Sequence, residues 1–269
     1  MIRNRLHDIW QAGRPVLNGW LSIGNAFTAE IMAAQGYDSL TIDLQHGALD
    51  YSAALPMLQA LRASGVVPMA RVPWLEPGII MKALDAGALG IICPMVSTAA
   101  DAARFAACMR YPPRGMRSYG PTRAAIAHGG YGVEANDAVL AFAMIETAEG
   151  LANLDEIAAT PGLDGIYVGP ADLTLDTQGG RFAPGFDREE PEMIALLRRI
   201  ATACRANGIH AGLHCGTPDY ALRAISWGYD LTTVSGDSRL LAGAASASVA
   251  AFRRLTEGAG DAAARAEGY

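Results

Sequence analysis

Short apolar segments that follow a glycine recur along the whole chain, and this repeat constrains the fold more than any other feature. In AAQGYDSLTID, DAGALGIICPM, RANGIHAGLH and SWGYDLTTVS, a helical pattern ends at a glycine and a short apolar run follows. Glycine commonly ends a helix because it adopts the left-handed backbone easily. The repeat therefore predicts alternating helices and strands, which is typical of a parallel sheet covered by helices.

The apolar runs predict eight strands that are buried on both faces, because each is too short and too apolar for a sheet with one face in water. They cover residues 19–23, 39–43, 67–72, 90–95, 141–146, 165–168, 210–213 and 230–234. Helical patterns lie between them at residues 27–34, 51–63, 78–85, 98–110, 150–158, 192–206 and 217–226. Eight such repeats predict a closed (β/α)₈ TIM barrel, with an open doubly wound sheet as the alternative.

The length and composition fit one domain of this kind. The chain has 269 residues, of which 51% are hydrophobic and 18% charged, and TIM barrels commonly run to about 250 residues as a single domain. We therefore expect residues 1–269 to form one barrel domain. Its C-terminal segment, about residues 240–269, is rich in alanine and is expected either to fray or to pack as a helix on a neighbouring subunit.

Charge and cysteine content argue against several partners. The net charge is −6 and no basic run occurs, so nucleic acid and anionic membrane surfaces are poor candidates. The N-terminus lacks the apolar core of a signal peptide, and no apolar stretch reaches the ~18 residues of a membrane span. The four cysteines form no C-x-x-C pair. We therefore expect reduced, mostly buried thiols and a cytoplasmic protein.

Two carboxylates stand at the ends of neighbouring predicted strands. Glu146 ends the fifth strand, and Asp172 follows the sixth. The C-terminal ends of all strands meet at one mouth of a barrel, where active sites form. Two carboxylates there suit a hard divalent cation such as Mg²⁺ or Mn²⁺. Salt bridges or helix caps are the structural alternative.

A histidine and an arginine are expected at the same mouth. His46 follows the second strand, three residues after Asp43. A carboxylate at that spacing is a candidate to orient the imidazole, and His46 is a candidate base. Arg71 ends the third strand and is a candidate to bind a substrate oxygen that becomes negative during reaction. A packed histidine and a structural ion pair are the alternatives.

Two long connections, 111–136 and 176–191, are also expected at this mouth, where long loops commonly serve as lids. In the first connection, Arg117, Ser118 and Arg123 are candidate contacts for a second substrate. The turn at residues 169–172 exposes backbone N–H groups of a kind that hold carboxylates or phosphates. A similar turn at residues 235–238 is expected to cap the helix that follows.

Two further features narrow the chemistry. His210 and His214 are four residues apart on a strand, but no H-E-x-x-H frame surrounds them, so core or loop positions are favoured over a metal site. The only lysine, Lys82, lies in a helical segment. A Schiff-base aldolase needs a lysine in the barrel mouth, so its position argues against that route and favours a metal with Arg71.

These residues carry a resemblance to a known family. Over about residues 19–241 the sequence resembles the HpcH/HpaI aldolases, the metal-dependent class II pyruvate aldolases. The matching segments are GYDSLTIDLQHG, ARVP, LDAGALGIICPMV, RYPPRGMRS, IETAEGLANL and DGIYVGPADL, of which the last two are the most specific. The resemblance implies a barrel of the phosphoenolpyruvate/pyruvate-domain type and a divalent metal cofactor, Mg²⁺, Mn²⁺ or Co²⁺.

The resemblance also implies roles for residues. Glu146 and Asp172 match the metal ligands, His46 the catalytic base, and Arg71 the arginine at the keto oxygen. The other positions expected to act in catalysis or substrate binding are Asp43, Asp85, Gly169, Pro170, Ala171 and Leu213, with Asp172 also on the substrate side. Asp85 is expected to reach a site across a subunit contact. The implied assembly is a homohexamer, a trimer of dimers with exchanged C-terminal helices.

The expected activity is reversible aldol cleavage of 4-hydroxy-2-keto acids to an aldehyde and pyruvate or hydroxypyruvate. A 2-keto-diacid decarboxylase or a CoA-thioester lyase with the same enolate site is the alternative, and a metal-dependent hydrolase or a non-catalytic metabolite-binding barrel is a weaker one. Met144 and Gln45 stand where relatives often have glutamine and glutamate. These two departures leave the natural substrate unassigned.

Overall fold

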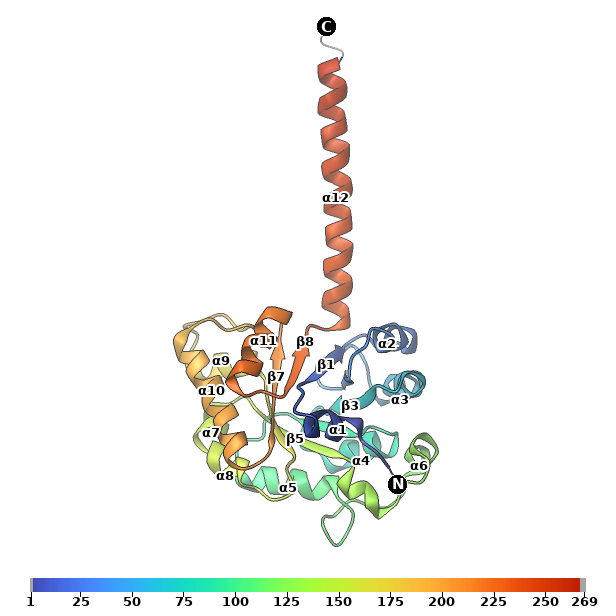
Figure 1. Cartoon of the computed structure of the whole chain (residues 1–269), viewed down its shortest axis with the longest axis vertical. Helices are drawn as coiled ribbons and strands as arrows, with labels where there is room; N and C mark the ends of the chain where they lie inside the picture. The colour runs from blue at the N-terminus through green and yellow to red at the C-terminus, as the bar shows by residue number, and fades with distance from the viewer. Residues whose placement is uncertain (1, 267–269) are drawn as a thin grey trace.

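The computed structural model describes residues 2–266, and the side chains of residues 2–256. Eight parallel strands form a closed barrel in sequence order, and β1 pairs with β8 to close it (Figure 1). The strands are β1 (Val16–Leu21), β2 (Ser39–Asp43), β3 (Val67–Arg71), β4 (Gly90–Cys93), β5 (Leu140–Ile145), β6 (Gly165–Val168), β7 (His210–Cys215) and β8 (Leu231–Val234). The predicted TIM barrel is confirmed, and the open doubly wound sheet is excluded.

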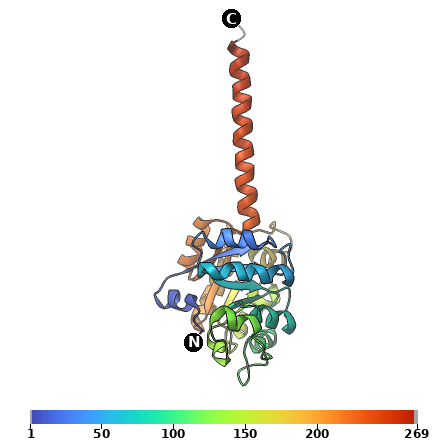
Figure 2. The ribbon, with the colours of Figure 1, turned by 90° about the vertical axis from the view of Figure 1, so that its right-hand side faces the viewer.

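Helices follow the strands and cover the outside of the barrel. They are α2 (Ala26–Ala33), α3 (Tyr51–Leu61), α4 (Pro77–Asp85), α5 (Ala99–Met109), α7 (Ala148–Ala152), α8 (Leu154–Ala158), α10 (Pro191–Ala206) and α11 (Pro218–Trp227). Figure 2 shows α2 and α3 packed side by side on one flank. Three further helices that the sequence analysis did not predict are α1 (Arg5–Gln11), α6 (Thr122–His128) and α9 (Pro170–Gln178).

The barrel interior combines large side chains with glycines that make room for them. A Cβ atom on Gly212 would lie 2.6 Å from the ring of the fully buried Tyr167, so only glycine fits there. A buried polar network joins β1, β2 and β8. In it the Asn18 amide donates to the Thr233 hydroxyl at 2.8 Å and accepts from the Ser39 hydroxyl at 2.8 Å. These contacts fix the relative position of the strands that carry the mouth.

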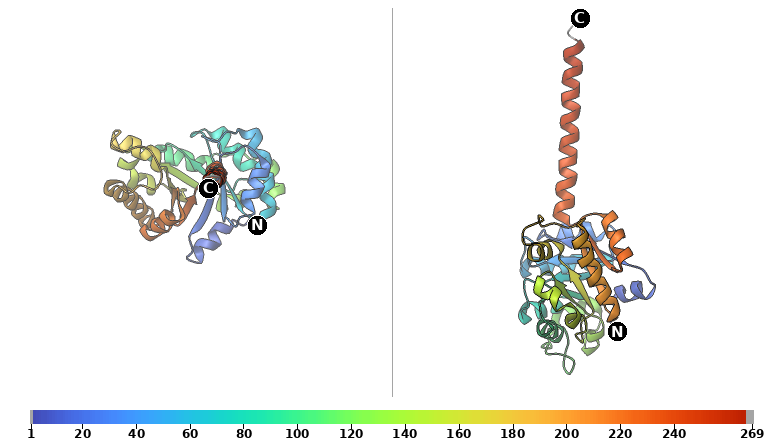
Figure 3. Two further views of the ribbon diagram at one scale, coloured as in Figure 1. Left: turned by 90° about the horizontal axis from the view of Figure 1, so that it is seen from above. Right: turned by 90° about the vertical axis from the view of Figure 1, so that its left-hand side faces the viewer.

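The last helix departs from a regular barrel. Instead of folding back over β8 and β1, α12 (Asp237–Ala266) projects away from the molecule (Figure 1), and Figure 3 shows it end-on from above. The side chains of residues 238–250 are exposed. The outer faces of β1 and β8 are left as an open groove beside α11, lined by Val16, Leu17, Leu222 and Ile225 among others.

Asp237 joins the first turn of α12 to the residues that follow β1. Its carboxylate accepts the backbone N–H groups of Ser22 at 2.9 Å and Ile23 at 3.0 Å. These two amides therefore bond to a side chain and not to a neighbouring strand. This explains why β1 ends at Leu21, whereas the apolar run predicted a strand at 19–23.

One loop prediction was wrong. The segment 111–136 follows α5 and leads into β5, so it lies at the N-terminal end of the barrel and not at the mouth. The other long connection, 176–191, begins within α9, a short helix between β6 and α10. It therefore belongs to a connection that follows a strand and lies at the mouth, where Asp187 accepts the backbone N–H of Gly216 at 2.7 Å. Among residues 2–266, no helix is both long and apolar enough to cross a membrane.

Candidate active site

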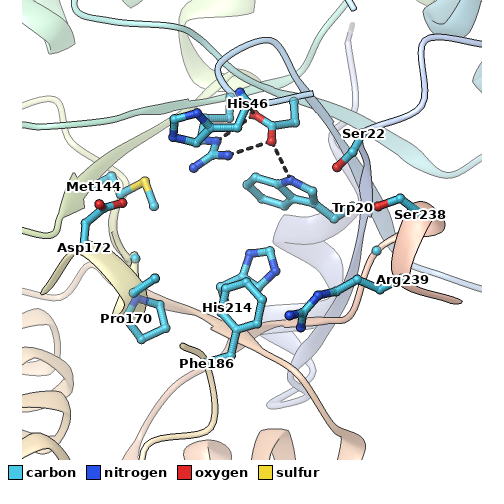
Figure 4. Close-up of a pocket in the computed structure, with 15 residues that line it drawn as sticks. Trp20, Ser22, His46, Met144, Pro170, Asp172, Phe186, His214, Ser238 and Arg239 are labelled. Atoms are coloured by element: carbon cyan, nitrogen blue, oxygen red, sulfur yellow. Dashed lines mark hydrogen bonds and ion pairs between the residues drawn. The ribbon is translucent and has the colours of Figure 1, made fainter. Parts of the chain in front are cut away.

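A cavity of about 280 Å³ opens at the C-terminal ends of the strands (Figure 4). Of the predicted site residues, it brings together Asp43, His46, Arg71, the turn from Gly169 to Asp172, and Met144. These residues lie far apart in the sequence and come from β2, β3, β5 and the loop after β6. The barrel therefore gathers them at one point, as the strand-end argument predicted.

Arg71 is held rigidly by a buried ion pair. Its Nε donates to Asp43 Oδ1 at 2.8 Å and its Nη2 to Oδ2 at 2.6 Å, while Trp20 Nε1 donates to Oδ2 at 3.1 Å. Burial by itself raises the pKa of the Asp43 carboxyl, but the hydrogen bonds and charge of Arg71 outweigh it and hold the pKa below its usual value. Asp43 thus stays ionised, and the remaining Arg71 nitrogen, Nη1, is free to face a ligand.

His46 lies beside this pair with an exposed imidazole (Figure 4). Asp43 Oδ1 accepts the backbone N–H of His46 at 3.3 Å and does not contact its ring. Asp43 therefore orients Arg71 directly and His46 only through the backbone, which corrects the expectation that it orients the imidazole. Among residues 2–256 no side chain or backbone group bonds to the His46 ring, so both ring nitrogens are available to a substrate.

Glu146 follows β5 and is almost fully buried, with 1% of its surface exposed. Its Oε1 accepts the Met95 backbone N–H at 2.9 Å. Met95 has the left-handed φ of 57°, a strained conformation for a non-glycine residue that is typical of functional sites. The second oxygen, Oε2, is buried and has no hydrogen-bond partner among the described residues.

The turn after β6 lies against this unpartnered oxygen. A Cβ atom at Gly169 would come within 2.4 Å of Glu146 Oε2, so the carboxylate packs directly on that backbone. Burial, with a contribution from the nearby Asp172 carboxylate, raises the pKa of Glu146 to about 7. Asp172 is exposed to the cavity whereas Glu146 is buried, and a cation between two such carboxylates would offset their repulsion and the cost of burying Glu146. The donor set therefore fits a hard divalent metal ion.

The number of protein ligands is small. Among the side chains described, those of residues 2–256, no group of three or more from histidine, cysteine, aspartate or glutamate could hold a metal. A site with Glu146 and Asp172 alone suits an ion that keeps water or substrate oxygens, which is the usual behaviour of Mg²⁺. It does not suit zinc sites with several histidines.

The first turn of α9 presents backbone donors to the cavity. Gly169 precedes the helix, Pro170 is its first residue, and Ala171 and Asp172 follow, all lining the cavity. The N–H groups in the first turn of a helix have no partner within the helix and attract anions. This turn can hold a substrate carboxylate next to the Glu146 side chain.

On β7 the cavity is lined by His214 and not by Leu213, the neighbouring residue that the sequence analysis expected to bind substrate. Leu213 is fully buried and does not line the cavity, whereas His214 does. Burial lowers the pKa of His214 to about 3, so its ring is neutral, and Tyr167 OH lies 3.2 Å from its Nδ1. His210 lies at the other end of the strand, 2.6 Å from Asp230. The two histidines therefore share no metal site.

Four other predicted residues lie outside the cavity. Asp85, at the end of α4, accepts from Arg117 Nη2 at 2.6 Å, and Arg117 is buried over the ring of Tyr111. Arg123 donates to the Leu58 carbonyl at 3.0 Å, and Ser118 lines a separate pocket beside α4. In a single chain, Arg117, Ser118 and Arg123 thus lie away from the cavity, contrary to their predicted contact with a second substrate.

Sequence reasoning missed one wall of the cavity. The lining residues that it did not identify are Trp20, Ser22, Phe186, His214 and Arg239, and Gly236 and Ser238 belong to the turn 235–238 that was expected to cap a helix. Ser22 follows β1 and Ser238 lies in the first turn of α12, so both stand after strand ends. The rule that identified His46 and Arg71 also applies to these positions.

Comparison with known proteins places this site in a family. The model of the HpcH/HpaI aldolase/citrate lyase family matches residues 18–243. The chain is 40% identical to the hydroxypyruvate/pyruvate aldolase of Rhizorhabdus wittichii, over 94% of this chain and 100% of that protein. It is 34% identical to a 4-hydroxy-2-oxo-heptane-1,7-dioate aldolase of Salmonella dublin, over 93% and 95% of the two chains.

A solved structure agrees with these sequence relatives. The crystal structure of an HpcH/HpaI aldolase/citrate lyase family protein from Burkholderia cenocepacia J2315 has a TM-score of 0.84 and 32% sequence identity, and the match covers 93% of this chain and 99% of that chain. The same barrel and the same family model extend over nearly the whole length. The chain therefore belongs to the HpcH/HpaI aldolase/citrate lyase family and is a carbon–carbon lyase of the aldolase kind.

Proposed function

We propose that this chain is a divalent-metal-dependent aldolase that cleaves 4-hydroxy-2-keto acids to an aldehyde and pyruvate or hydroxypyruvate, and that also runs the addition. The observation that carries the proposal is the buried, unpartnered Oε2 of Glu146 beside the first turn of α9. The relative named hydroxypyruvate/pyruvate aldolase supports the choice of keto acid.

Glu146 and Asp172 would hold the metal, and membership of the family implies a divalent ion. When bound, such an ion supplies Lewis acidity that draws electron density from the keto group and makes the C3 proton removable. We propose Mg²⁺, Mn²⁺ or Co²⁺, because the two protein ligands are both carboxylates.

The chain's own residues bind and orient the keto acid. Ala171 and Asp172 line the cavity in the first turn of α9, and their backbone N–H groups would hold its carboxylate. Arg71 Nη1 would donate to the keto oxygen. Since Asp43 already fixes the guanidinium, that donor needs no rearrangement when the oxygen becomes negative, which is the basis of electrostatic preorganisation.

His46 would move the proton at C3, because its ring is in the cavity and bonds to no other described residue. In the cleavage direction, His46 would accept the proton of the C4 hydroxyl while the C3–C4 bond breaks and C4 becomes the aldehyde. The electron pair of that bond passes into the enolate of the keto acid, and His46 would then give the same proton to C3. In the direction of aldol addition, His46 would take the proton from C3, the enolate carbon would attack the aldehyde carbon, and the resulting alkoxide would take the proton back from His46.

We further propose the homohexamer, with α12 exchanged between subunits. The helix exposes Leu241, Phe252 and Leu255, which are 63%, 67% and 75% exposed. Their spacings of eleven and three residues place them on one side of the helix. The open groove on β1 and β8 offers an apolar surface for a partner's helix. In the same assembly Asp85 would reach a neighbouring subunit's cavity.

The compartment also remains a proposal. All four cysteines are buried and free, which suits the reducing cytoplasm.

Residues 267–269, at the end of the segment expected to pack on a neighbour, lie outside the described part of the chain.

Aldol activity before and after chelation tests the proposed function. Pyruvate and hydroxypyruvate would each be mixed with a panel of aldehydes, using protein treated with EDTA and then supplied with Mg²⁺, Mn²⁺ or Co²⁺. We expect turnover only with metal. Turnover that survives thorough chelation would contradict the metal assignment, and thioester or oxaloacetate cleavage without any aldol product would favour the alternative enolate chemistry.

A further inference from the structure

The side of the cavity opposite Asp172 carries hydrogen-bond donors without protein partners. Ser22, Ser238 and Arg239 line this side (Figure 4). Ser22 and Ser238 use their backbone N–H groups to bind Asp237, which leaves their hydroxyls unused. Among residues 2–256, no group accepts a hydrogen bond from either hydroxyl or from the Arg239 guanidinium. Such donors suit a ligand with several acceptor oxygens.

Arg239 is held by stacking and by no carboxylate. Its Cζ lies 4.6 Å from the centre of the Phe186 ring, and Phe186 stacks on His214 with ring centres 4.4 Å apart. Stacking fixes the plane of a guanidinium while its N–H edge stays available for the two oxygens of a carboxylate or phosphate.

The charges around the cavity are separated between its two sides. Carboxylates close to Arg239 in sequence, or next to a residue that it contacts, already have partners: Asp237 binds the amides of Ser22 and Ile23, and Asp187 binds the Gly216 amide and the Thr217 hydroxyl. Burial keeps the pKa of His214 at about 3, so that ring is neutral. The wall of Arg239 therefore carries an unpaired positive charge, while Asp172 supplies a carboxylate on the opposite wall.

We propose that this wall is the acceptor subsite, and that it selects aldehydes with an anionic group at the end remote from the carbonyl. The inference rests on the proposed function, because the keto acid would occupy the side of Glu146 and Asp172. The aldehyde carbonyl would then face the keto acid, and its carboxylate or phosphate would face Arg239, with the Ser22 and Ser238 hydroxyls as further donors. Since Arg239 and Asp172 lie on opposite sides of the cavity, the anion is separated from the reacting carbon by a short chain.

Matched pairs of aldehydes test the subsite. Succinate semialdehyde would be compared with the uncharged 4-oxobutanamide, and D-glyceraldehyde 3-phosphate with D-glyceraldehyde, each with pyruvate and Mg²⁺. We expect kcat/KM to be higher for the anionic member of at least one pair. The pair with the larger ratio identifies carboxylate or phosphate as the preferred anion.

Substitution of Arg239 assigns the preference to that residue. Arg239→Gln is expected to reduce the anionic-to-neutral ratio of kcat/KM by about tenfold or more, the usual effect of losing a charge-assisted hydrogen bond. Arg239→Lys keeps the charge and is expected to retain most of the ratio. The control is Arg104→Gln on α5, an exposed arginine remote from the cavity, which is expected to leave the ratio at the wild-type value.

The outcomes separate the subsite from the proposed function. If the wild-type chain forms aldol products but shows no preference in either pair, or if Arg239→Gln lowers both members of a pair equally, the acceptor subsite is wrong and the aldolase stands. If the wild-type chain forms no aldol product with any aldehyde and metal, the proposed function is wrong and the subsite falls with it.

Discussion

Asp43 holds the Arg71 side chain in a fixed position at the cavity. Arg71 is 8% exposed and forms two hydrogen bonds to Asp43, which is 2% exposed. A buried ion pair of this geometry is costly to break because the remaining charge has lost its water. We therefore propose that Asp43 is a positioning residue that would affect catalysis through Arg71.

Removal of Asp43 tests that role. Asp43→Ala is expected to lower the free energy of unfolding by about 3 kcal/mol, because Arg71 is left buried without a partner. The control is Asp8→Ala, which breaks the exposed pair with Arg3 and is expected to cost much less, because water screens an exposed ion pair. Urea unfolding measures both. Equal costs for the two variants would show that Arg71 does not depend on Asp43.

His46 is predicted to act in proton transfer and not in binding. His46→Ala is expected to slow exchange of the pyruvate C3 protons in D₂O by about 10²–10⁴-fold, the usual contribution of a general base. Calorimetry should show unchanged metal binding, because Glu146 and Asp172 are intact. Exchange at the wild-type rate would remove His46 from the role of base.

At the scale of elements, the alternation of side chains along β7 decides which of two neighbouring residues lines the cavity. Leu213 and His214 are neighbours on β7, and only the second points into the cavity. Alternate residues of a strand face opposite sides, and the apolar run in the sequence does not reveal which set faces the barrel axis. Positions after strand ends were easier to predict, as His46, Arg71 and Asp172 show.

The long loop illustrates a second limit. Glycine, proline and arginine in 111–136 suggested an active-site lid, but in a barrel only connections that follow strands lie at the mouth. The segment follows α5. Its Arg117 instead packs on the ring of Tyr111 and pairs with Asp85. The order of helices and strands correctly indicates the end of the barrel at which this segment lies, whereas its amino-acid composition led to a wrong prediction.

The projecting helix α12 makes a prediction about assembly. Leu241→Asp together with Phe252→Asp is expected to reduce the oligomer to smaller species, because each side chain contributes about 1.5–3 kcal/mol when fully buried. Ser246→Asp, an exposed residue on another side of the helix, is the control and should leave the mass unchanged. Light scattering after gel filtration measures the mass. A wild-type monomer, or a double variant of wild-type mass, would contradict helix exchange.

For the whole molecule, the repeat of glycine and apolar run was sufficient to predict the barrel. Parallel strands buried on both faces have a distinct composition, and eight of them in succession close into a barrel. The position of α12 could not be predicted in this way. Its apolar side chains are consistent with packing either on the chain's own barrel or on a neighbour's. Arg239, at its first turn, was missed for the same reason.

The account depends on a divalent ion held by Glu146 and Asp172 that makes a bound keto acid lose its C3 proton. The most direct test is proton NMR of pyruvate C3 exchange in D₂O, with chelated protein before and after addition of Mg²⁺, for the wild type and for Glu146→Gln. The account predicts exchange only in the wild type with Mg²⁺. Equal exchange without metal, or undiminished exchange in Glu146→Gln, would contradict it.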